Sequence, residues 1–143
     1  MKPMVSKEDL RAAQAIADWN TAHGSVLERV TAACGALEEA CELALESPSD
    51  AAYQAARAAG HNLATVADEA LRGPWAGIPQ YDDPRRRGLE CYREAGELAG
   101  TFDPTDERDE NGEGAAALLF KGRQITSQAT AFTSDLLRRV QHH

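Results

Sequence analysis

Small and apolar residues recur every three or four positions between Leu10 and Leu45. Residues with this spacing stack on one side of an α-helix, which has 3.6 residues per turn. The phase is preserved across Gly24, so the pattern predicts one helix of about 40 residues, roughly 60 Å long. Glycine in a helix interior costs about 1 kcal/mol relative to alanine, so a kink or a break at Gly24 is the alternative. The predicted inward positions are Ile16, Trp19, His23, Val26, Val30, Ala33, Leu37, Ala40 and Ala44, with Leu27, Cys34, Cys41 and Leu45 one step behind them.

The rest of the chain is also helical in pattern, and no stretch alternates with the period of two that a half-buried strand requires. Alanine, the best helix former, occurs 27 times,. The sequence therefore predicts an all-α fold, an up-down-up-down four-helix bundle, as a single domain over residues 1–143,. The helices are expected at about 6–47, 50–72, 84–99 and 114–140.

Capping residues and prolines set these predicted boundaries. Ser6 followed by Asp9 resembles a capping box at the start of the first helix,. Pro48 cannot continue that helix, so the helix should end just before it,. Asp83 is expected to cap the third helix, because Pro84 would then occupy the first helical position, where a missing N–H costs nothing,.

The predicted connection over residues 73–83 is unusually apolar for a loop. It contains Trp75, Ile78 and Tyr81, whereas connecting segments run over the surface. Either these side chains fill the end of the bundle, or they contact a partner.

The predicted helices differ in length. The first, at roughly 60 Å, would extend beyond the second, at roughly 36 Å, and its start would lie beside the tail of the fourth. Apolar surface left uncovered there would favour a homodimer. The candidate interaction residues are Ile16, Trp19, Trp75, Ile78, Tyr81, Phe132 and Leu136.

The charge balance bears on possible partners and on location. The formal net charge of −8 argues against nucleic acid and against anionic membranes as partners,. No apolar run approaches the roughly 20 residues of a membrane span, and the first residues lack the apolar core of a signal peptide. Cys34 and Cys41 are too far apart on one helix to form a disulfide,. We therefore expect reduced thiols and a cytoplasmic location.

No catalytic residue, cofactor-binding residue or metal ligand is predicted. The sequence has no Gly-rich phosphate loop, no Gly-x-Ser-x-Gly and no Glu-x-x-His,. Glu39, Glu42 and Glu46 share one helix face, but they lie out of phase with the apolar positions. His23 and His61 should lie at different levels of two antiparallel helices, so a shared metal site is not expected. The sequence gives no indication of whether a small molecule binds.

Two resemblances to known proteins are present. Trp75-Ala76-Gly77, in a turn between two helices, resembles the Trp-x-Gly turn of small type VII secretion substrates. Those hairpins usually carry a Tyr-x-x-x-Asp/Glu signal after the second helix, and this chain lacks it. The overall plan resembles uncharacterised Ala- and Arg-rich four-helix proteins of actinobacteria, which implies the fold but no activity. That resemblance covers most of the chain and rests on Trp19, Tyr92-x-x-Ala95, Leu119-x-x-Gly122 and an excess of arginine over lysine.

These observations give three hypotheses of function. The preferred one is a non-catalytic module that binds a protein partner or a second copy of itself as a homodimer. The second is a ligand-binding or enzymatic bundle with a pocket near the 73–83 loop. The third is a type VII secretion substrate. The interaction module is preferred because it requires the fewest assumptions about individual residues.

Overall fold

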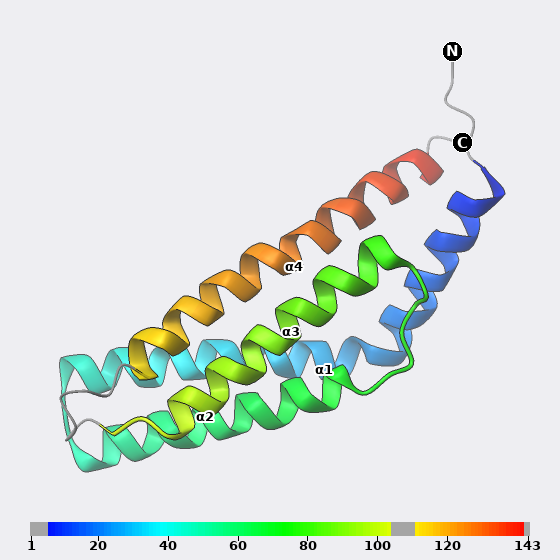
Figure 1. Cartoon of the computed structure of the whole chain (residues 1–143). Coiled ribbons are helices and arrows are strands. Elements are labelled where there is room, and N and C mark those ends of the chain that lie inside the picture. The colour runs from blue at the N-terminus through cyan, green and yellow to red at the C-terminus, as the bar shows by residue number, and fades with distance from the viewer. Residues whose placement is uncertain (1–5, 104–110, 142–143) are drawn as a thin grey trace.

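The computed structural model describes residues 6–103 and 111–141, and these residues form four α-helices and no strand. The all-α four-helix bundle is therefore confirmed (Figure 1). Consecutive helices pack against each other, and α1 contacts α4 far less than it contacts α2. The helices are α1 (Lys7–Glu46), α2 (Asp50–Leu71), α3 (Pro79–Gly100) and α4 (Asn111–Gln141).

The first helix is the longest element. It contains 40 residues and continues through Gly24, so a break there is excluded. Its N-cap is Ser6, whose Oγ accepts a hydrogen bond from the Asp9 N–H at 3.0 Å. Figure 1 shows that the helix is bent, its first turns being inclined to the rest. The start of α1 lies beside the end of α4, where Arg139 contacts Asp9 at 3.4 Å.

The predicted start of the third helix is wrong. Helix α3 begins at Pro79 rather than at residue 84, so Tyr81 lies on a helix and not in a loop. Asp82 explains the earlier start, because its Oδ2 accepts hydrogen bonds from the N–H groups of Gly77 and Ile78 at 2.8 and 3.1 Å. These bonds satisfy N–H groups that a helix start leaves without partners. Pro84 lies inside the helix, where its missing N–H removes one hydrogen bond,.

The fourth helix also begins earlier than predicted, at Asn111 rather than near 114, and it ends at Gln141. The acidic segment before it, residues 104–110, lies outside the described part of the chain. None of the helices in the described residues is long and apolar enough to cross a membrane.

The core consists of two groups of buried side chains. The larger group lies between the four helices around Leu37, Leu63 and Leu89. Glycines allow α2 and α3 to approach closely, since a Cβ added at Gly60 would lie 2.7 Å from the Gly100 nitrogen. One predicted inward position is wrong, because Leu45 is 82% exposed. It lies in the last turn of α1.

Candidate interaction surface

The smaller core group lies at the end of the bundle where the start of α1 meets the end of α4. It brings together all seven candidate interaction residues. Four of them are almost completely buried, and the other three are half-buried against them. The buried residues are Ile16, Trp19, Tyr81 and Leu136, and the half-buried ones are Trp75, Ile78 and Phe132.

Trp19 lies at the centre of this group. Its ring stacks with that of Trp75 at a centroid distance of 5.2 Å and with that of His23 at 4.7 Å. Tyr81 meets it edge-on at 5.4 Å. The indole Nε1 also donates a hydrogen bond to the Pro74 carbonyl at 3.0 Å. These contacts attach the α2–α3 connection to α1.

Tyr81 connects α3 to the same region of α1. Its side chain is fully buried, and its hydroxyl donates a hydrogen bond to Asn20 Oδ1 at 2.7 Å. Burial raises the pKa of Tyr81, so the hydroxyl remains a protonated donor at neutral pH,. The guanidinium of Arg85 lies 5.2 Å from the Tyr81 ring and that of Arg86 lies 4.8 Å from the Trp75 ring. Cation–π attraction therefore adds to the packing at this end.

The 73–83 segment fills the end of the bundle with its side chains. Trp75 contacts Trp19 and Arg86, and Tyr81 has no exposed surface. These contacts favour the first of the two sequence interpretations, in which the aromatic groups pack within the chain. Packing and backbone conformation within the chain also explain the Trp75-Ala76-Gly77 sequence of this turn. Trp75 packs on α1, and Gly77 has a φ of +80°, which favours glycine,.

Some apolar surface stays accessible where the start of α1 meets the end of α4, and it lies between these two helices. A shallow depression of about 100 Å³ separates the two helices there. Leu10 and Leu137 are each 42% exposed, and Leu137 lines this depression. The lining residues are Ala13, Ile16, Ala17, Asn20, Thr133, Leu136 and Leu137. We call the apolar surface formed by the exposed Leu10, Ala17 and Leu137 and the half-buried Ala13 the open face.

No family model, curated protein or solved structure matches this chain. The functional argument therefore depends on the geometry of the open face and its surroundings.

His23 and His61, the two histidines in the described part of the chain, have different surroundings. His23 stacks on Trp19, and its Nδ1 lies 3.1 Å from the Trp19 carbonyl. His61 lies on α2 against the end of α3, because a Cβ added at Gly100 would come 2.7 Å from its ring. Within the described residues, no group of three or more His, Cys, Asp or Glu side chains could hold a metal ion.

The three cysteines are free. Burial raises the pKa of Cys34 to about 11, and it also raises the pKa of Cys41 and of Cys91. The thiolate is the nucleophilic form, so these thiols are poor nucleophiles at neutral pH.

The candidate interaction residues predicted from the sequence do not include the residues of the open face, although Leu10 was expected near the tail of the fourth helix. Leu10 and Ala17 lie on the side of α1 next to the buried positions, and Leu137 directly follows the buried Leu136. A helical wheel centred on Ile16 and Leu136 would have placed them at the edge of the apolar side. Asn20 carried no signal, because its role depends on a hydroxyl from a distant helix.

Proposed function

We propose that this chain is a non-catalytic helical-bundle interaction module that forms a homodimer through the open face. The single observation that carries the proposal is that the start of α1 and the end of α4 expose Leu10 and Leu137 beside an apolar depression. Exposed apolar surface next to an ordered core is typical of interaction sites.

The size of the open face predicts a weak dimer. About fifteen residues of α1 extend over roughly 22 Å, and two adjacent helices span roughly 18 Å, which gives on the order of 400 Å² per copy. Stable interfaces bury about 800 Å² per partner. We therefore expect dissociation constants in the micromolar range and fast exchange between monomer and dimer.

Sedimentation velocity from 5 to about 300 µM tests the proposal, and the weight-average mass should rise towards that of a dimer. Leu137→Gln should shift this rise to at least fivefold higher concentration, because it removes an exposed apolar side chain. Phe120→Gln is the matched control: Phe120 is 63% exposed on α4 but far from the open face. A monomeric mass over the whole range would contradict the proposal.

Ile16→Asp is a poor test of dimer formation. Ile16 is only 3% exposed, so the change would place an unpaired charge in the core,. Loss of the dimer in that variant would not be separable from loss of the fold.

A further inference from the structure

We infer that the start of α1, residues 7–23, is an arm that opens as a unit about Gly24 and leaves the larger core intact. In the closed state the arm packs against the start of α3 and the end of α4. The opening goes beyond the proposed function. Its consequence for the open face rests on that function, because the open face lies partly on the arm.

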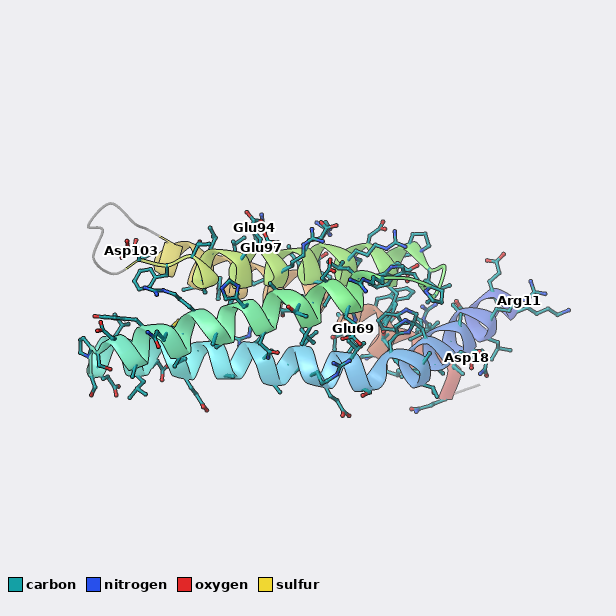
Figure 2. The ribbon with its side chains drawn as sticks, turned by 90° about the horizontal axis from the view of Figure 1, so that it is seen from below. Arg11, Asp18, Glu69, Glu94, Glu97 and Asp103 are labelled. Atoms are coloured by element: carbon teal, nitrogen blue, oxygen red, sulfur yellow. The ribbon has the colours of Figure 1, made fainter. Side chains whose placement is uncertain are left out.

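The arm extends beyond the end of α2. Arg29 forms an ion pair at 2.6 Å with Glu69, which lies two residues before the last residue of α2. Because α1 and α2 run side by side in opposite directions, about 20 residues of α1, roughly 30 Å, continue past that end (Figure 1),. Figure 2 shows α1 passing Glu69 and continuing to Asp18 and Arg11. The arm therefore depends on α3, α4 and the α2–α3 connection for its packing.

The buried side chains of α1 divide between the two cores at Gly24. Ile16 and Trp19 of the arm belong to the smaller core, whereas Val26 and Val30 belong to the larger one. In the described part of the chain, the half-buried side chains that pack against both cores are Leu27 and Trp75. Cores that share so few side chains can lose their packing separately, because proteins open locally in groups of contacts.

Gly24 is the point of α1 at which a change of direction meets least resistance. A Cβ added there would have no packing neighbour within 4 Å. Glycine also has the widest backbone freedom, and sharp kinks occur at Gly/Ser pairs such as Gly24-Ser25,. The first turns of α1 are already inclined to the rest of the helix (Figure 1). Gly24 therefore provides the hinge.

The arm is held closed by packing in the smaller core and by three polar contacts with other segments. An arm that stays helical when it opens keeps its own backbone hydrogen bonds, so its opening costs less than unfolding of the whole chain. The three contacts are the hydrogen bonds from Trp19 to the Pro74 carbonyl and from Tyr81 to Asn20, and the ion pair of Arg139 with Asp9.

Opening of the arm divides the open face. Leu10, Ala13 and Ala17 lie on the arm, whereas Leu137 lies on α4. A dimer that forms through the open face therefore binds only the closed state, and its formation stabilises the closed arm by mass action. The fraction of chains with an open arm lowers the apparent affinity of the dimer in the same proportion.

Urea unfolding followed by two probes tests the opening. Tryptophan fluorescence reports on the arm, because Trp19 and Trp75 are the two tryptophans of the chain and stack on each other. Circular dichroism at about 222 nm reports on all four helices. In the monomer, at about 2 µM, the fluorescence midpoint should lie at least about 0.5 M urea below the circular dichroism midpoint. Coincident midpoints would overturn the inference.

Two glycine variants of α1 test the position of the hinge. Gly24→Ala should narrow the gap between the two midpoints, because it stiffens the helix between the arm and the larger core. Gly35→Ala is the matched control: it also lies inside α1 with no atom within 4 Å of the new Cβ, but it follows the arm. It should raise the circular dichroism midpoint without narrowing the gap. Equal effects of the two variants on the gap would contradict a hinge at Gly24.

The protein concentration separates this inference from the proposed function. At about 300 µM the fluorescence midpoint should move towards the circular dichroism midpoint, and Leu137→Gln should reduce this movement. Separate midpoints that do not depend on concentration would support the arm and contradict a dimer through the open face. Coincident midpoints at about 2 µM in a chain that dimerises at higher concentration would overturn the arm and leave the proposed function standing.

Discussion

Trp19 of α1 and Trp75 of the α2–α3 connection stack at a centroid distance of 5.2 Å with an interplanar angle of 19°. The hydrogen bond from Trp19 Nε1 to the Pro74 carbonyl lies beside this stack. The start of α1 extends beyond α2, so these contacts and those of Tyr81 hold it against the rest of the bundle. The position of the open face therefore depends on this aromatic group.

Trp75→Ala should destabilise the fold by about 2–3 kcal/mol. Fully buried tryptophans lose about 3–5 kcal/mol on truncation, and Trp75 is only half-buried,. Urea unfolding followed by circular dichroism measures the change. Ala76→Ser, at the neighbouring half-buried position, is the control and should cost less than about 1 kcal/mol,. An unchanged midpoint in Trp75→Ala would mean that the stack does not hold α1.

The hydrogen bond between Tyr81 and Asn20 should show coupling in a double-mutant cycle. Tyr81→Phe removes the donor and should cost about 1 kcal/mol,. Asn20→Leu should cost about 1–3 kcal/mol, because it leaves a buried hydroxyl without its partner,. The double variant should lose less than the sum of the two. Additive losses would show that the two groups do not interact in solution.

The helical period predicted the long first helix, and the predicted helix lengths placed the start of that helix beside the end of the fourth. Ile16, Trp19 and Leu136 were expected at one end of the bundle, and they lie there together. The period identifies which side of a helix is buried, but not which chain covers it. These residues were candidates for an interface, whereas the described chain covers them itself.

The start of α3 was only partly predictable from local sequence. Asp83 followed by Pro84 has the form of a helix start, and the helix begins at Pro79 instead. The carboxylate of Asp82 reaches back to two N–H groups, and burial of Tyr81 against Trp19 requires the earlier turn. The Asp82 bonds are local, over four and five residues, whereas the contact of Tyr81 with Trp19 depends on tertiary structure, which local propensity does not report.

The exposure of Leu45 has a similar cause. Its position in the helical period matches that of the half-buried Leu27, but Leu45 is 82% exposed. The period identifies the apolar side of α1, but it does not report how far along the helix a neighbouring element covers that side.

Two glycines should respond in opposite directions to replacement by alanine. Gly60→Ala should cost about 1–3 kcal/mol, because the new Cβ would lie 2.7 Å from the Gly100 nitrogen and 2.8 Å from the Gly96 carbonyl oxygen,. Gly24→Ala should instead stabilise the fold by up to about 1 kcal/mol, because it lies inside α1 with no atom within 4 Å of the new Cβ,. Thermal unfolding of the two variants measures both signs. Stabilisation by Gly60→Ala would contradict the close approach of α2 and α3.

The stability of the fold should fall between about pH 9 and pH 11, and Cys34 is a principal cause. Its thiol has a pKa near 9.0 when unfolded and about 11 when folded, because burial disfavours the thiolate,. As the pH rises through this window, the unfolded chain loses the proton first, so the folded state retains more protons and its stability decreases. The raised pKa values of Tyr81 and Tyr92 act in the same direction.

Cys34→Ala separates the thiol from the tyrosines. The slope of unfolding free energy against pH should become shallower in this variant by up to about 1 kcal/mol per pH unit near pH 10. Cys91→Ala is the matched control, since burial also raises the pKa of Cys91, which is somewhat more exposed than Cys34, at 8% against 4%. It should flatten the slope less than Cys34→Ala does. Equal slopes in the wild-type chain and in Cys34→Ala would contradict this account, because they would show that burial in the folded chain does not keep the Cys34 thiol protonated.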